Sequence, residues 1–239
     1  METSNHIKTA LKVETIIDLD ALYDRAFNVL KEALDNGSEN FGLATGGTML
    51  PLYERIRNSD LDFTQCESVN LDEYVGLPKT HPESYISFMK QQLFNEKPFK
   101  KSNLPNGEAL DPHEEAACYE SLLQKMKLNF QLLGIGENGH IGFNEPGTPF
   151  DSETHVVELE ESTRIANARF FNSLDEVPTK AITMGISSIM RAEQILLIAV
   201  GEKKRTALEA LLRGEVTEDV PVTILKKHPN VIVLTDLVI

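Results

Sequence analysis

Residues 130–147 read FQLLGIGENGHIGFNEPG, in which an apolar run leads directly into a chain of glycines. A short apolar run bounded by glycines indicates a buried strand that ends in a tight loop. Such loops often hold a phosphate, because glycine lets backbone N–H groups approach a ligand closely. This loop also carries Asn138, His140 and Glu145, so the stretch predicts either a phosphate cradle or a catalytic site.

Segments of strand type alternate with segments of helix type on both sides of this stretch. The further predicted strands lie at 12–17, 41–45, 67–75, 180–185, 194–201 and 231–236. The predicted helices lie at 21–34, 48–58, 81–96, 187–193 and 204–214. Continuous apolar runs are typical of strands that are buried on both faces. The alternation therefore predicts an α/β fold, with a mostly parallel sheet, helices on both faces and one domain over residues 1–239.

The composition narrows the choice of partners and compartments. Lys and Arg number 23 against 37 Asp and Glu, so the formal net charge is −14. An acidic chain lacks the positive footprint that nucleic acids and anionic membranes require. The two cysteines, Cys66 and Cys118, have no metal-binding spacing and favour a reducing, cytoplasmic setting. We expect no signal peptide and no membrane span, since no apolar stretch is long enough.

Two further strand ends carry side chains that could bind or react. In ATGGT (44–48) the glycines and the start of the following helix favour an anion, although a tight turn with a Thr cap would read the same way. In NLDEYVGL (70–77), Asp72 or Glu73 could act as a general base, or an Asp could cap a turn or pair with a Lys. Neighbouring residues point in different directions, so at most one of the two carboxylates should face the site.

The loop after residue 133 holds the best candidate for proton transfer at neutral pH. His140 is the one histidine inside a dense run of glycines and polar residues, and Glu145 or Asn138 could orient it. One histidine with scattered carboxylates does not make a zinc site, so no metal is expected. Basic groups for an anion could come from the run 203–205 or from Arg164 and Arg169, each of which also fits a solvated helix face.

The motifs ATGGT (44–48), VNLDEYVGLPKTHPESYISFM (69–89), LLGIGENGHIGFNEPGTPF (132–150) and TRIANARFF (163–171), with the G-x-x-K run 201–204, occur in this order. Together they resemble the glucosamine-6-phosphate deaminase family, from about the first predicted strand to the C-terminus. The resemblance implies a Rossmann-like sheet with the site at the carboxyl ends of its strands. It also implies conversion of glucosamine 6-phosphate and water into fructose 6-phosphate and ammonia in amino-sugar catabolism, without an organic cofactor or a metal.

The resemblance assigns roles by position. It implies that Asp72 moves a proton between C2 and C1, while Asn138, His140 and Glu145 open the sugar ring. The positions that match the phosphate-binding residues are Gly46, Gly47, Thr48, Arg169 and Lys204. The chemistry of these side chains agrees, because ring opening needs an acid–base such as His140 and the C2-to-C1 transfer suits one carboxylate with a raised pKa in a semi-buried site.

The chain departs from the family pattern at two places. Some members carry Asp where this chain has Asn138, so the orienting role at His140 should rest mainly on Glu145. Longer members bind N-acetylglucosamine 6-phosphate as an activator through basic residues after the NEPG loop and through a C-terminal extension. Here the matching region 151–162 is acidic and the sequence stops at Ile239, so we expect no such activation. A monomer and a homo-oligomer both fit the sequence.

Two other functions compete with the deaminase. A 6-phosphogluconolactonase of the same fold would use His140 as a base on water and would have no need for Asp72. A non-catalytic sugar-phosphate sensor would usually add a DNA-binding domain, for which this acidic chain has no room.

Overall fold

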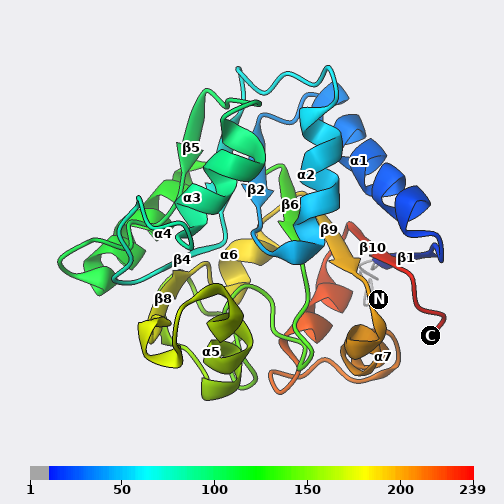
Figure 1. Ribbon diagram of the computed structural model, residues 1–239. Helices are drawn as coiled ribbons and strands as arrows, with labels where there is room; N and C mark the ends of the chain where they lie inside the picture. The colour runs from blue at the N-terminus through cyan, green and yellow to red at the C-terminus, as the bar shows by residue number, and fades with distance from the viewer. Residues whose placement is uncertain (1–10) are drawn as a thin grey trace, which may run out of the picture.

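The computed structural model describes residues 11–239 and builds them around a seven-stranded parallel sheet (Figure 1). The strand order is β1-β10-β9-β6-β2-β3-β5. The strands are β1 (Leu11–Thr15), β2 (Asn40–Leu43), β3 (Glu67–Asn70), β5 (Lys101–Asn103), β6 (Phe130–Leu133), β9 (Gln194–Ala199) and β10 (Val231–Thr235). Every residue of β6 is buried, as the continuous apolar run predicts.

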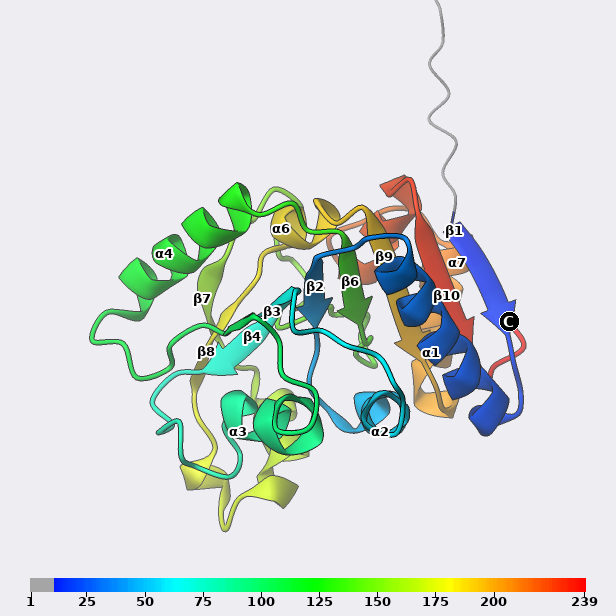
Figure 2. The ribbon, with the colours of Figure 1, turned by 90° about the horizontal axis from the view of Figure 1, so that it is seen from above.

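Helices cover both faces of this sheet, which confirms the predicted architecture (Figure 2). Helices α1 (Leu19–Asp35) and α2 (Leu50–Arg57) pack together on one face, and α6 (Ile186–Met190) and α7 (Arg205–Arg213) lie on the other. The start of α1 follows from the sequence, because the side chain of Asp18 accepts a hydrogen bond from the N–H of Ala21. Within the described residues, every helix is too short or too polar to span a lipid bilayer.

The strand order reverses direction between β2 and β6. From β2 the chain continues to β3 on one side, whereas from β6 it continues to β9 on the other. Strands β2 and β6 are themselves neighbours, so their carboxyl ends open side by side. In open α/β sheets such a reversal leaves a crevice where ligands bind.

A second, three-stranded antiparallel sheet lies beside the first. It consists of β4 (Asp72–Tyr74), β8 (Lys180–Thr183) and β7 (His155–Glu158), in the order β4-β8-β7. The prediction of one strand over 67–75 was therefore wrong, since the chain changes sheets at Leu71. The N–H of Leu71 donates to Leu43 of β2, while its carbonyl accepts from Met184 just after β8. The predicted strand 180–185 likewise belongs to this second sheet and not to the parallel one.

Several elements differ from the sequence prediction or were not predicted. The expected helix at 81–96 begins only at Tyr85, because Ser84 caps it by accepting from the N–H of Ser87, and α3 (Tyr85–Met89) then widens into a π-helix over Lys90–Phe94. Helix α4 (Pro112–Lys125), helix α5 (Glu161–Asn167) and the strands β5 and β7 were not predicted.

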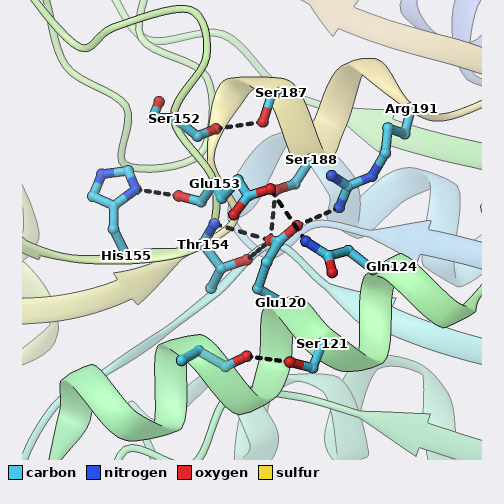
Figure 3. Close-up of polar contacts among 11 residues, drawn as sticks. Glu120, Ser121, Gln124, Ser152, Glu153, Thr154, His155, Ser187, Ser188 and Arg191 are labelled. Atoms are coloured by element: carbon cyan, nitrogen blue, oxygen red, sulfur yellow. Dashed lines mark hydrogen bonds and ion pairs between the residues drawn. The ribbon is translucent and has the colours of Figure 1, made fainter.

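Glu120 of α4 is a buried carboxylate that joins three parts of the chain (Figure 3). It accepts hydrogen bonds from the N–H and hydroxyl of Thr154, at 3.0 and 2.6 Å, and from the hydroxyl of Ser188 at 2.7 Å. Arg191 pairs with its other oxygen at 2.5 Å. Burial alone would raise the pKa of Glu120, but these bonds outweigh it and lower the pKa to about 2. The cluster holds α4 against α6 and the segment before β7.

Candidate active site

A cavity of about 550 Å³ opens at the carboxyl ends of the central strands. Its walls come from the segments that follow β2, β3 and β6, with Lys204 from the 3₁₀ turn Glu202–Lys204 after β9. Helices α3 and α5 complete it through Tyr85, Thr163 and Asn167. The cavity therefore lies at the reversal of strand order, and its volume is in the range of small-molecule sites.

Asp72 lies in the wall of this cavity with only 7% of its surface exposed. None of the described residues donates a hydrogen bond to its carboxylate. Burial, with a smaller contribution from the neighbouring charge of Glu73, raises the pKa of Asp72 to about 8. A carboxyl with such a pKa can both accept and return a proton near neutral pH.

Glu73 points away from the cavity, as the alternation of side chains along a strand requires. Its carboxylate accepts the backbone N–H groups of Tyr74, Tyr85 and Ile86 at 2.9 to 3.0 Å. It thus binds the first turn of α3, and only Asp72 of the adjacent pair faces the site, as predicted.

His140 is held in the cavity by a chain of hydrogen bonds. Its Nδ1 lies 2.8 Å from Oδ1 of Asn138, whose Nδ2 donates to Oε2 of Glu145 at 2.7 Å. Since an amide oxygen only accepts, this orientation of Asn138 places the imidazole proton on Nδ1 and leaves Nε2 as the basic nitrogen. Glu145 also approaches Nδ1 directly, at 3.5 Å.

Glu145 is buried behind His140 and does not line the cavity itself. Burial alone would raise its pKa, but contacts with His140, Asn138 and Thr163 outweigh burial and lower the pKa. The carboxylate is thus kept charged beside the imidazole, as in a catalytic triad. Asn138 bridges Glu145 and His140 by hydrogen bonds to both. The sequence prediction had assigned the orientation of His140 mainly to Glu145.

One glycine of the loop 134–147, Gly136, is required by a close contact. A Cβ at this position would lie 2.2 Å from atoms of the His140 ring. Any side chain there would displace the imidazole, so this glycine makes room for the His140 ring. This supports the catalytic interpretation of the loop over the phosphate cradle.

The loop after β2 has the geometry of an anion site. Gly46 has φ 105° and ψ 164°, a conformation open essentially to glycine alone, and it precedes a 3₁₀ turn (Gly47–Met49) that continues into α2. Gly46 and Thr48 line the cavity, whereas Gly47 does not. The free N–H groups at the start of a helix attract a phosphate.

The basic residues divide into those that line the cavity and those that do not. Lys204 lines it, and burial lowers the pKa of its ammonium. Lys203 pairs with Glu137 at 3.5 Å, and Arg205 pairs with Glu202. Arg169 is exposed in the 3₁₀ turn Ala168–Phe170 and is not among the lining residues, so its phosphate role stays a prediction.

The sequence matches one family of sugar-phosphate enzymes over most of its length. Residues 19–233 match the model of the glucosamine-6-phosphate isomerases/6-phosphogluconolactonase family. A glucosamine-6-phosphate deaminase of Lysinibacillus sphaericus is 66% identical over 204 residues, which cover 85% of this chain and 92% of that protein. The chain belongs to this family. A Streptococcus uberis glucosamine-6-phosphate deaminase is 53% identical over 211 residues, covering 88% of this chain and 90% of the relative.

Solved structures of the glucosamine-6-phosphate isomerase/6-phosphogluconolactonase family share the fold. A monomeric glucosamine-6-phosphate deaminase superposes with a TM-score of 0.91 at 41% identity, covering 94% of this chain and 97% of that one. The 6-phosphogluconolactonase of Trypanosoma brucei gives a TM-score of 0.79 at 15% identity, with coverages of 95% and 97%. The second likeness concerns the fold alone.

This member of the family brings most of the residues predicted from sequence to one cavity. The residues that line it are Gly46, Thr48, Asp72, Asn138, His140 and Lys204. The cavity is also lined by three residues to which sequence reasoning assigned no role, Tyr85, Thr163 and Asn167. Thr163 and Asn167 could have been found as a pair four residues apart, had α5 been predicted as a helix.

Proposed function

We propose that this protein is a glucosamine-6-phosphate deaminase that converts glucosamine 6-phosphate and water into fructose 6-phosphate and ammonia. The observation that carries the proposal is that one cavity holds both the buried carboxyl of Asp72 and the His140 group. Ring opening and proton transfer between carbons need two separate acid–base groups on one substrate, and the cavity supplies both.

The same observation favours the deaminase over the lactonase. Hydrolysis of a lactone needs one base that activates water, which His140 alone could supply. A second carboxyl with a pKa of about 8 in the same cavity would then have no task. Curated relatives named glucosamine-6-phosphate deaminase are 66% and 53% identical to this chain and a solved structure of that name is 41% identical, whereas the 6-phosphogluconolactonase of Trypanosoma brucei is only 15% identical.

The first step opens the sugar ring. Nε2 of His140 takes the proton of the hydroxyl on C1, the bond from C1 to the ring oxygen breaks, and the imidazolium returns the proton to that oxygen, which becomes the hydroxyl on C5 while C1 becomes an aldehyde. Asn138 stabilises the imidazolium that forms by accepting the hydrogen bond from Nδ1, and Glu145 stabilises it as the nearby negative charge. The phosphate is held by the loop that starts at Gly46 and by Lys204, with Arg169 as a further candidate.

The second step moves a proton from C2 to C1. The carboxylate of Asp72 takes the C2 proton, the electron pair of that bond forms a C1–C2 double bond, and the carbonyl oxygen on C1 takes a proton from the ammonium group on C2 of the substrate. Return of the proton to C1 leaves a C2–nitrogen double bond. Water adds to C2, and ammonia departs to leave the ketose. Holding the chain by its phosphate keeps both carbons within reach of one carboxyl.

The deciding assay measures ammonia and fructose 6-phosphate together after incubation with glucosamine 6-phosphate. We expect both products in equal amounts from the wild type, none from D72N, and a strong loss in H140Q. Galactosamine 6-phosphate and 6-phosphogluconolactone, given to the same preparation, test the sugar and the competing reaction. Folded wild-type protein that hydrolyses the lactone but releases no ammonia would refute the proposal.

We further infer a cytoplasmic enzyme in which both sheets form one domain. Cys66 and Cys118 are unpaired, which suits a reducing compartment. The two sheets share Leu71, whose N–H and carbonyl bond to different sheets. Limited proteolysis that released one sheet as a stable fragment would contradict the single domain.

A further inference from the structure

Helix α5 presents two polar side chains to the cavity. Thr163 and Asn167 both line it, and a spacing of four residues places them one turn apart on the same face of the helix. The neighbouring Ile165 is 56% exposed and faces away. Each of the two polar residues makes a hydrogen bond to a different part of the site.

Thr163 reaches the group that opens the ring. Its hydroxyl donates to Oε1 of Glu145 at 3.1 Å, while Oε2 of the same carboxylate accepts from Asn138. Both oxygens of Glu145 are thus occupied, and the plane of the carboxylate is fixed. Because Glu145 faces Nδ1 of His140, the bond from Thr163 sets the angle at which the charge meets the imidazole.

Asn167 reaches the strand that carries the base. Its Nδ2 donates to the hydroxyl of Tyr74 at 2.8 Å. Tyr74 stands two residues after Asp72 on β4, so the two side chains share a face of the strand. The ring of Tyr74 also packs against the ring of Tyr85, with centroids 4.7 Å apart, and Tyr85 lines the cavity together with Asp72.

We propose that Thr163 and Asn167 are positioning residues for the two halves of the reaction, Thr163 for ring opening and Asn167 for proton transfer. One helix then sets the geometry of both acid–base groups, so α5 couples two steps whose groups lie on different elements. The inference rests on the proposed deaminase function and assigns each residue to one step.

The test compares substitutions on α5 by their effect on a deuterium isotope effect. T163V removes the hydroxyl and keeps the shape, whereas T163S keeps the hydroxyl. N167L removes the amide at similar volume, and I165A is the matched control on the outer face. For each variant, kcat and kcat/KM are measured with glucosamine 6-phosphate and with the same substrate deuterated at C2, after a melting curve has shown that the variant is folded.

The two variants should shift the isotope effect on kcat/KM in opposite directions. Loss of a hydrogen bond to a charged group should lower kcat of T163V about tenfold, and slower ring opening should move its isotope effect toward unity. N167L should slow proton transfer, so its isotope effect should rise above that of the wild type. T163S should recover most of the activity lost in T163V, and I165A should match the wild type.

A double-mutant cycle of N167L with Y74F separates positioning from general damage to the helix. If Asn167 acts through the Tyr74 hydroxyl, the double variant should be little worse than the poorer single variant. Isotope effects that stay unchanged, or that move the same way in T163V and N167L, would overturn the inference. An inactive wild type would instead refute the deaminase proposal, so the two failures are distinguishable.

Discussion

Replacing Asp72 by asparagine should stabilise the folded protein, and the gain should grow as the pH rises. Asp72 is buried, receives no hydrogen bond from the described residues, and has a pKa of about 8 in place of 3.8. Above the ordinary pKa, the unfolded chain releases this proton while the folded protein retains it. A folded state that binds more protons than the unfolded state loses stability with rising pH.

The size of the effect follows from the shift in pKa. From about pH 5 to about pH 8, the unfolded carboxyl is ionised and the folded one is not, so each pH unit removes about 1.4 kcal/mol of stability. Over this interval the gain of D72N over the wild type should grow by about 4 kcal/mol and then level off. For a protein of this length, that corresponds to a growth of roughly 8–16 °C in the difference between the two melting temperatures.

The assay is equilibrium urea denaturation of wild type and D72N at several pH values. The slope of the free energy of unfolding against urea concentration should be the same for both proteins. E120Q is the control, because hydrogen bonds lower the pKa of Glu120 to about 2 and its ion-pair partner is Arg191, which stays charged throughout the range. The difference between E120Q and the wild type should therefore stay constant from about pH 6 to about pH 8. The difference in the free energy of unfolding between D72N and the wild type should level off at the pH at which kcat/KM of the wild type reaches its plateau.

A difference between D72N and the wild type that varies by less than about 1 kcal/mol over this range would refute the reasoning. Asp72 would then ionise as an ordinary surface carboxyl, and its burial would have no energetic consequence. A difference that shrinks with pH would refute it more strongly, because that sign belongs to a carboxyl stabilised in its charged form.

Three further predictions follow from other parts of the structure. G46A should weaken substrate binding and cost about 1–3 kcal/mol of stability, because φ is 105° at Gly46. G47A should be tolerated, and measurements of KM and of urea unfolding distinguish the two variants. E120Q should destabilise the protein by about 3 kcal/mol near neutral pH and by less toward about pH 2, where the wild type also becomes protonated, as denaturation at several pH values would show. N-acetylglucosamine 6-phosphate should leave the initial rate unchanged at low substrate, because the segment 151–162 is acidic and repels a phosphate; a several-fold activation would contradict this.

The parallel sheet could be predicted because most of its strands can be recognised from their own local runs of apolar residues. Runs such as FQLLGIG and QILLIAVG are apolar except for one glutamine each, and the segments that follow them carry residues that line the cavity. The sequence does not show to which sheet a strand belongs, since three of the four residues of β8 are buried, as in strands of the parallel sheet, and yet β8 pairs antiparallel with its neighbours. Helix α4 was not predicted because its buried face includes the charged residue Glu120. Hydrogen bonds from Thr154 and Ser188, which are distant in sequence, compensate for the burial of this charge.

The candidate site shows the same division between local and distant causes. The identities of Asp72 and His140 follow from local motifs, because glycines and polar groups after a strand are visible in sequence. The link from Asn138 to Glu145 needs two loop turns to bring them within 2.7 Å, and the bonds from α5 span 18 residues to Glu145 and 93 to Tyr74. Contacts over such separations are set by tertiary packing.

The raised pKa of Asp72 and its reach to the substrate have a common structural origin. The chain leaves the parallel sheet after Asn70 and enters the antiparallel sheet at Asp72, with Leu71 bonded to both. The side chain that follows Leu71 is buried where the two sheets meet, and Leu71 and Asp72 both line the cavity at the end of β3. A carboxyl placed there is withdrawn from bulk water while it borders the space that the substrate would fill. Moving the carboxyl of Asp72 out of this position would restore an ordinary pKa and remove it from the cavity, so its cost in stability and its proposed use as a base have the same cause.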